Sequence, residues 1–503
     1  MRVVIIGGGI GGLATAVRLQ ASGHQTVLLE KNDSLGGRCN QLQVEGFSFD
    51  TGPTLLLMKD VVEELFRSAG RRASDYLQLQ KMEPNYRITF ADGSVLDATP
   101  DRAVMAEQLD RFEAGAGDRY ASFLRSAGLN YRVARARFVE RNFTNIFQFA
   151  TPLNLYYLLR TGALRSLFGQ TRRYFEDERL RLAFTFQTMY LGNSPLNAPA
   201  IYSLLPYTEL EEGIWFPRGG MYELVRQIAR LATELGADIR TGSEVRSLIL
   251  SGGRAHGVRT SSGEEIEADV VVANADLPQA YRSLLPESLR PEMSNARLKR
   301  LKFTPSAYLM YLGVDRVYPQ LLHHNVFLAG DFRRNFAEIF ADRVLPKDPS
   351  LYIAAPTRSD PSLAPPGCDN IYVLVPVPYL SPAIDWRRDE PDFRERVYAK
   401  LEALGLDNLR QHVVVERTMT PADMATGYNL ARGSAFGLSH DFHQVGYFRP
   451  ANRAKKVPNL YFVGASTVPG TGIPMVILGS RMVWERIERE QKGATHALAT
   501  SVS

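Results

Sequence analysis

The first turn of the chain carries glycines that precede a carboxylate, a combination that can bind a nucleotide. Gly7, Gly9 and Gly12 have the G-x-G-x-x-G spacing, and Glu30 follows after a helix-length segment. In a dinucleotide site the first glycine allows a turn, the second admits a pyrophosphate, and the third lets a helix pack closely on a strand. The acid accepts hydrogen bonds from a ribose. The spacing predicts a dinucleotide site, although glycine-rich turns also serve tight packing alone.

The elements that position these residues follow from the apolar pattern. Residues 3–6 form an uninterrupted β-branched run, typical of a strand buried on both faces. Residues 13–19 continue as a helix whose N-terminus offers N–H groups and a positive dipole end to phosphates. Residues 27–30 give a second strand. Similar buried strands at 269–276 and 459–463 predict that the dinucleotide domain is assembled from segments far apart in the chain.

The glycine pair after the ribose acid narrows the choice of dinucleotide. Arg38 follows Gly36 and Gly37 and can place a planar, permanently charged group beside phosphates or a flavin; the alternative is a surface turn with a solvated arginine. This opening, with residues 47–53, resembles the flavin-dependent amine oxidase and carotenoid desaturase superfamily. The resemblance implies FAD and an α/β fold, with a Rossmann-like FAD-binding domain of the glutathione-reductase type and a mixed-sheet substrate domain.

The resemblance also implies which positions contact FAD. They come from the first turn, the end of the second strand, the two glycine motifs that follow, the middle strands and the C-terminal strand–turn–helix. The positions are Gly7, Gly9, Gly12, Glu30, Lys31, Gly37, Arg38, Gly52, Pro53, Thr54, Val245, Asn274, Gly464, Ala465, Gly472, Ile473 and Met475.

Further motifs make the resemblance more specific, to bacterial carotenoid desaturases of the phytoene desaturase type. They lie at residues 50–53, 217–221, 324–327, 360–367, 433–437, 447–450 and 464–480. Residues 39–42 and 138–141 favour the diapophytoene (dehydrosqualene) branch. Residues 475–479 are larger than phytoene desaturases usually carry, so the length of the substrate stays open.

The activity implied is FAD-dependent introduction of successive C–C double bonds into phytoene or 4,4'-diapophytoene, giving coloured polyenes. Three alternatives remain: a carotenoid oxygenase or isomerase on the same scaffold, a polyene-binding flavoprotein without activity, and, less well supported, an amine oxidase. The electron acceptor would be a quinone or oxygen.

Polar catalytic groups are hard to identify in the sequence. No Ser-His-Asp set, metal-ligand spacing or paired carboxylates can be recognised, so no metal site is predicted, and the reaction would depend on its cofactor. Glu140 and Arg141 are the candidates for polar groups near the reacting bond. The competing interpretation is an intrahelical ion pair or a solvated helix face.

Composition limits the environment of the chain. It has 503 residues, of which 45% are hydrophobic and 22% charged, as in ordinary globular proteins. Cys39 and Cys368 lie far apart, which favours a reducing compartment. We expect no signal peptide, and the sequence has no apolar run of about 18 residues. The net charge of +5 could attract nucleic acid or an anionic membrane surface. Because the sequence has no recognisable nucleic-acid-binding motif, the membrane surface is the favoured partner.

Segments of the predicted FAD-binding domain alternate along the chain with inserted regions. The inserted region at residues 100–203 is rich in arginine, leucine and aromatic residues. Such helices would either pack on the core or lie in a membrane interface, with arginines toward headgroups. We therefore expect a peripheral protein on the cytoplasmic side of the membrane; the oligomeric state is not predicted. The boundaries are 1–84 for FAD binding, 85–99 for a substrate-domain hairpin, 100–203 for the helical membrane-associating region, 204–290 for FAD binding, 291–416 for the substrate domain and 417–503 for FAD binding.

Overall fold

A five-stranded parallel sheet forms the centre of one half of the molecule in the computed structural model, which describes residues 1–501 and the side chains of residues 1–492. The strands run in the order β19-β13-β1-β2-β9. Numbered 1 to 5 along the chain and read from β9, this order is 3-2-1-4-5, the doubly wound order. Their bounds are β1 Arg2–Ile6, β2 Gln25–Leu29, β9 Asp238–Arg240, β13 Val270–Ala273 and β19 Leu460–Phe462. The expectation of a sheet built from distant segments is confirmed.

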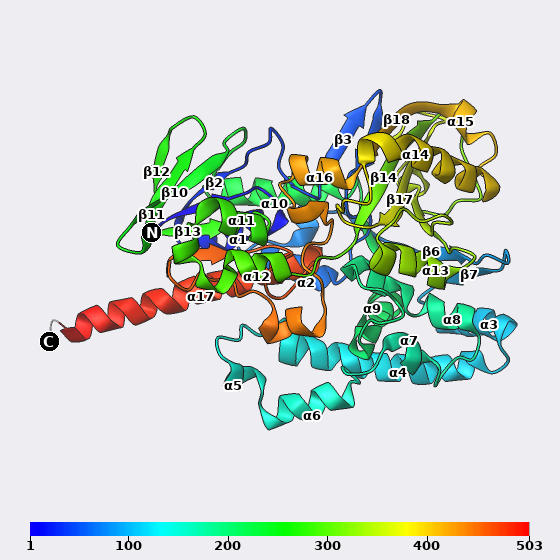
Figure 1. Ribbon diagram of the computed structural model, residues 1–503, viewed down its shortest axis with the longest axis horizontal. Coiled ribbons are helices and arrows are strands. Elements are labelled where there is room, and N and C mark those ends of the chain that lie inside the picture. Colours follow the sequence, from blue (N-terminus) through cyan, green and yellow to red (C-terminus); the bar gives the residue numbers. More distant parts are fainter. Residues whose placement is uncertain (502–503) are drawn as a thin grey trace.

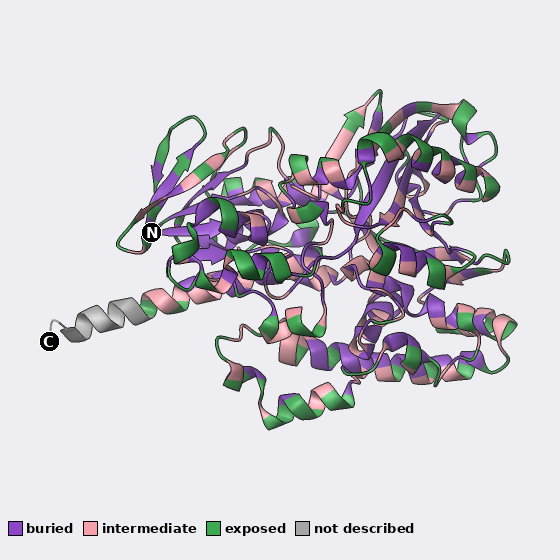
Figure 2. Ribbon diagram, in the orientation of Figure 1, coloured by how far each residue is buried: buried purple, intermediate pink, exposed green. Residues whose placement is uncertain are grey.

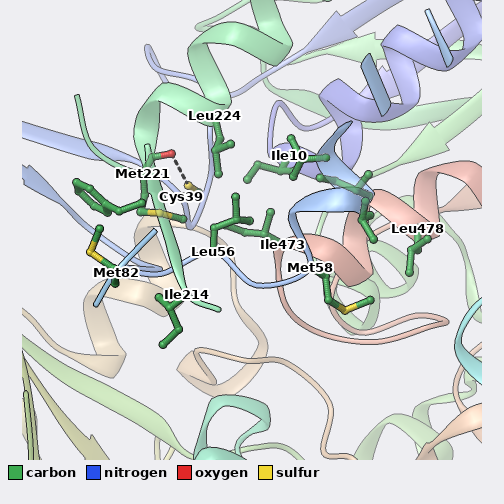
Figure 3. Close-up of a cluster of buried hydrophobic side chains, with 14 of the residues drawn as sticks. Ile10, Cys39, Leu56, Met58, Met82, Ile214, Met221, Leu224, Ile473 and Leu478 are labelled. Carbon is green, nitrogen blue, oxygen red and sulfur yellow. Dashed lines mark hydrogen bonds between the residues drawn. The ribbon is translucent and has the colours of Figure 1, made fainter. Parts of the chain in front are cut away.

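Helices cover this sheet because its strands are apolar on both faces. Four of the five residues of β1 are buried. Helix α1 packs against both α10 and α17, and Figure 3 shows Ile10 of α1, Leu224 of α10 and Ile473 of α17 in one apolar cluster. The helices are α1 Ile10–Ala21, α2 Lys59–Ser68, α10 Tyr222–Glu234, α11 Leu277–Leu284, α12 Asn295–Arg300 and α17 Ile473–Ser501.

A mixed seven-stranded sheet forms the second half, to the right of the first in Figure 1. The strand order in this sheet is β18-β14-β17-β16-β15-β6-β7. Strand β15 pairs in parallel with β6, and all other neighbouring strands of the sheet pair antiparallel. The bounds are β6 Tyr86–Thr89, β7 Val95–Ala98, β14 Ser306–Val314, β15 His324–Phe327, β16 Leu351–Ala354, β17 Asp369–Val377 and β18 Val413–Met419, with helices α13 Phe332–Ala337, α14 Trp386–Ala403, α15 Leu409–His412 and α16 Pro421–Gly427. The mixed sheet expected from the sequence is therefore present.

Smaller sheets complete the strand structure. The three-stranded sheet contains β10 Val245–Ser251, β11 Arg254–Thr260 and β12 Glu265–Glu267. The two-stranded sheets pair β3 Gln41–Val44 with β4 Phe47–Asp50, and β5 Leu79–Lys81 with β8 Trp215–Pro217.

Helices lie below both sheets in Figure 1 and form the helical layer. They are α3 Arg102–Phe112, α4 Ala116–Ala134, α5 Ile146–Phe149, α6 Pro152–Arg160, α7 Leu167–Thr171, α8 Glu178–Ala183 and α9 Leu204–Tyr207, with π-helical segments η2 Arg135–Val139 and η5 Thr208–Glu212 and the 3-10 segment η3 Phe186–Leu191. Figure 2 shows α6 to be largely exposed. Among the described residues no helix is both long and apolar enough to span a bilayer.

Candidate active site

The first turn of the chain closes around two glycines. Gly7 has a φ of +100°, which favours glycine. A Cβ on Gly12 would lie 2.2 Å from the carbonyl oxygen of Gly7, so any side chain there would push α1 away from β1. Gly9 directly precedes α1, whose free N–H groups are the phosphate-binding end of the helix. The turn thus fits a pyrophosphate.

Glu30 is fixed at the end of β2. Its side chain is buried, with Oε2 accepting from the backbone N–H of Gly8 at 2.7 Å and Oε1 accepting from that of Asn32 at 2.9 Å. A carboxylate has about four lone-pair positions, so each oxygen keeps the capacity to accept from a ribose hydroxyl.

Polar side chains join the distant segments around this turn. Asn274, after β13, donates from Nδ2 to the carbonyl of Gly7 at 3.2 Å. Arg38 donates from Nη1 to the carbonyl of Ala435 at 2.9 Å. Asp276 accepts from the N–H of Ala431 at 3.0 Å and from Ser466 Oγ at 2.8 Å. Burial lowers the pKa of Arg38, and the charge of Asp276 opposes that change.

Two motifs that are far apart in the sequence meet beside Arg38. Asp50 accepts from the backbone N–H of Met221 at 2.7 Å and of Tyr222 at 2.9 Å, which fixes the start of α10. A Cβ on Gly52 would lie 1.8 Å from the carbonyl oxygen of Arg38, so these two backbone segments touch without intervening side chains.

These groups surround one cavity of about 920 Å³, which lies in the range of ligand pockets. Every position expected to contact FAD lines it, except Gly12. Gly12 does not line the cavity; it packs closely against Gly7, the role expected of the third glycine. The contact of each lining residue with FAD stays a prediction.

The cavity continues from the glycine turn into an apolar region between the helical layer and the seven-stranded sheet. Its wall there is formed by side chains from η3, α9, β15 and β16 and the segments beside them. They include Phe186, Met189, Leu191, Leu204, Leu205, Val326, Leu328 and Leu351. An elongated apolar ligand could lie in this region, with one part beside the dinucleotide turn.

Glu140 and Arg141 do not lie on the cavity wall. Glu140 accepts from Arg135 Nε at 2.5 Å and from Arg481 Nη2 at 3.1 Å, forming ion pairs with both. Arg141 is exposed and donates from Nε to the carbonyl of Ala136 at 3.0 Å. The Arg135–Glu140 pair resembles the local ion pair of the competing interpretation, but Arg481 comes from α17 and Arg141 makes no ion pair among the described residues. The catalytic role of Glu140 and Arg141 stays a prediction.

Sequence reasoning missed a polar chain on the cavity wall. Tyr352 lines the cavity, and its hydroxyl lies 2.6 Å from Thr54 Oγ1 and 2.7 Å from His324 Nδ1. Burial lowers the pKa of His324 well below its usual value. The sequence motif at 324–327 pointed to His324 alone. Tyr352 could not be recognised, because it lies in an apolar strand, β16, without a motif of its own.

A second missed residue is Arg449, which is buried and organises the loop after β19. It donates to the carbonyls of Ala465 and Thr467 and to those of Leu438, Ser439 and Gln444. It belongs to the motif at 447–450, which signalled its presence without its role.

The doubly wound sheet, the glycine turn and the buried acid define a dinucleotide-binding fold. The family model described as flavin containing amine oxidoreductase matches residues 10–485. A putrescine oxidase structure bound to putrescine has a TM-score of 0.61 at 16% identity, covering 98% of this chain and 99% of that one. That likeness concerns the fold alone.

Curated relatives narrow the class. The zeta-carotene-forming phytoene desaturase of Myxococcus xanthus is 47% identical over 97% of this chain and 93% of its own length. The 4,4'-diapolycopene oxygenase of a Methylomonas species is 38% identical over 97% and 98%. The 4,4'-diapophytoene desaturase of Staphylococcus haemolyticus is 36% identical over 96% and 98%. This chain belongs to the carotenoid desaturases of the flavin containing amine oxidoreductase family. It is an oxidoreductase whose cofactor is FAD.

Proposed function

We propose that this protein desaturates phytoene or 4,4'-diapophytoene, introducing successive C–C double bonds to give coloured polyenes. One observation carries the proposal: a single cavity joins the dinucleotide turn to a long apolar wall. Relatives acting on carotenoid precursors, at 36% to 47% identity over nearly the whole chain, give it further support.

The chain's own residues would act mainly by binding and positioning. The Gly7–Gly9 turn and the N-terminus of α1 would hold the pyrophosphate, and Glu30 would hold the ribose. The apolar wall would align a hydrocarbon and exclude water. FAD, when bound, supplies the acceptor for the hydride that the substrate loses.

Product analysis tests this proposal and its alternatives together. Purified protein would be supplied with phytoene and, separately, with diapophytoene in liposomes, and the products separated by chromatography. We expect conjugated polyenes that contain no added oxygen. Oxygenated ends would favour the oxygenase alternative, which the Methylomonas relative represents. Unchanged substrate that co-purifies with the protein would favour a binding role, and hydrogen peroxide released from amines would favour an amine oxidase.

We also propose peripheral association with the cytoplasmic side of a membrane, from which such hydrocarbons would enter. Helix α6 supports this because it buries Asn154, whose Nδ2 donates to the carbonyl of Phe149 at 2.9 Å, while its leucines face outward. An apolar surface results, whose members are Phe147 (84% exposed), Leu153, Leu155, Tyr156, Leu159 (69%) and Leu164 (70%). Exposed Arg160 and Arg165 border it, as expected of an interfacial element.

The proposed electron acceptor is a quinone or oxygen. Turnover measured under nitrogen with a soluble quinone, beside turnover in air without one, would separate the two.

A further inference from the structure

A buried carboxyl group lies behind the apolar wall, in the π-helical segment η5. Glu209 is 0% exposed, and its Oε2 accepts from the hydroxyl of Tyr86 at 2.9 Å. Tyr86 in turn accepts from Gln187 Nε2 at 2.9 Å. The groups that face the carboxyl are Tyr86 from β6, and Gln187 and Tyr190 from η3. No cation faces it in the part of the chain whose side chains are described. Single π-helical turns of this kind often occur at functional sites.

Tyr190 connects this carboxyl to the cavity. Its side chain lines the cavity and interacts with Glu209 and with Tyr352. Tyr352 is hydrogen-bonded to Thr54, one of the positions expected to contact FAD. Glu209 is therefore separated from the cavity by one tyrosine, and that tyrosine interacts with Tyr352, the partner of an expected FAD contact.

The hydrogen bonding around Glu209 lacks a donor. Oε1 of Glu209 and Oε1 of Gln187 are buried without partners among the described residues, although buried oxygens are usually satisfied. A proton on the carboxyl would supply the missing donor. Burial also raises the pKa of Glu209 to about 8, despite hydrogen bonds from Tyr86, Tyr190 and Gln187 that lower it.

We infer that Glu209, acting through Tyr190, receives the proton that the substrate loses in each desaturation. One carbon loses a hydride to the oxidant already assigned, and its neighbour loses a proton to the Tyr190 oxygen. The Tyr190 hydroxyl proton passes to Glu209 as the C=C bond forms. Tyr190 is then the catalytic residue that contacts the substrate, and Glu209 positions and drives the transfer. This inference depends on the proposed function.

The kinetic test compares E209Q and Y190F with wild type and with a matched control, E211Q. Glu211 lies in the same segment η5 but pairs with Arg102 and does not line the cavity. We expect E209Q and Y190F to lower the single-turnover rate of flavin reduction by phytoene by about 10²- to 10⁴-fold, the range for loss of a general base. E211Q should stay close to wild type, and E209D should recover part of the rate that E209Q loses. FAD content should be the same in all four variants.

The pH profile adds a readout that a structural role would not change. The carboxyl accepts a proton only when ionised, so the wild-type rate should rise with pH and level off above about 8, whereas E209Q should lose this dependence.

Thermal stability separates the inference from a purely structural role for Glu209. A pKa raised by folding means that stability is lost as pH rises from about 4.3, the unfolded value, to the folded pKa. Glutamine avoids that loss, so the Tm of E209Q should exceed that of wild type at pH 8.5, and the difference should shrink at pH 5. A structural role for the carboxylate predicts a lower Tm instead.

Three results would overturn the inference. An E209Q variant that turns over as fast as wild type would do so, as would an E211Q variant as slow as E209Q, or an E209Q variant whose Tm falls at pH 8.5. Wild-type protein that binds FAD but leaves both polyenes unchanged would overturn the proposed function, and the inference with it.

Discussion

Close backbone approach at single glycines shapes the dinucleotide end of the cavity. Gly12 and Gly52 stand where a Cβ would lie 2.2 Å and 1.8 Å from carbonyl oxygens of Gly7 and Arg38. Gly9 faces the cavity, and a Cβ there would lie 2.9 Å from Asn274 Nδ2. A side chain at Gly12 or Gly52 would push the neighbouring backbone away, and one at Gly9 would occupy space in the cavity where we expect the cofactor.

Replacing Gly9 by valine should abolish retention of FAD. The branched side chain would occupy the space of the pyrophosphate and displace Asn274. The measurement is the ratio of flavin absorbance to protein after purification. Gly427→Val is the control, because nothing lies within 4 Å of a Cβ at Gly427. A Gly9→Val protein that remains yellow would count against this site.

The glycines and Glu30 could be predicted from the sequence because residue type and spacing specify that geometry. Glu209 could not. It lies in the run Thr208–Glu212 with two other glutamates, a pattern typical of a solvated helix face. Its burial comes from Asn85 and Tyr86, more than a hundred residues away, with Asn85 Nδ2 donating to the Glu209 carbonyl at 2.7 Å. The residues next to Glu209 in the sequence give no indication that side chains from distant segments cover it.

Among the helices, α10 is fixed at its start by the side chain of Asp50, which belongs to strand β4. The two N–H groups that Asp50 accepts are among those that a helix leaves without internal partners. Burial raises the pKa of Asp50 to about 6, and the same two hydrogen bonds lower it. Asp50 thus links the β3–β4 hairpin to a helix that packs on α1.

Asp50→Ala should lower the free energy of unfolding by about 1–2 kcal/mol, the usual effect of removing a helix cap. Urea denaturation followed by circular dichroism measures it. Asp50→Asn should lose less, because its carboxamide oxygen still accepts one hydrogen bond. An alanine variant as stable as wild type would mean that these bonds do not fix α10.

Elements with strong apolar runs could be predicted, and weakly patterned ones could not. The apolar runs at residues 306–312, 351–355 and 371–377 predict strands, and the structure has β14, β16 and β17 at these positions. Strand β15 (His324–Phe327) was missed because it is short and begins with polar residues, and β18 (Val413–Met419) because it contains Glu416 and Arg417.

Two boundaries that the sequence pattern predicts are wrong. The pattern at residues 237–245 predicts a strand that runs on into the hairpin after it, but β9 ends at Arg240 and β10 lies in another sheet. The pattern at 392–404 predicts a helix, but this helix, α14, begins at Trp386, because Asp385 accepts from the N–H of Arg387 and caps it.

Helices α5 and α6, which carry most of the residues of the apolar surface, lie at the edge of the helical layer away from the two sheets (Figures 1 and 2). The loop at 446–448 packs on Phe149 through Tyr447 and Phe448, with ring centroids 6.0 and 5.9 Å from that of Phe149. The exposure of leucines on α6 has no explanation within the chain and is expected of a surface that enters a bilayer interface.

Serine at Phe147, Leu159 and Leu164 together should weaken binding to liposomes with little change in Tm, because these side chains are mostly exposed. Val414→Ser, at a residue 50% exposed on β18, is the control. Flotation of the protein with vesicles measures the binding. Equal flotation of the triple variant and the control would remove the case for this surface.

Anaerobic mixing of the FAD-loaded protein with phytoene or diapophytoene in liposomes tests whether the bound flavin oxidises the polyene. We expect the visible flavin absorbance to bleach with one of the two substrates, and one new double bond to appear in the polyene for each flavin reduced. Flavin that stays fully oxidised with both substrates, in a protein shown to have bound them, would contradict this expectation.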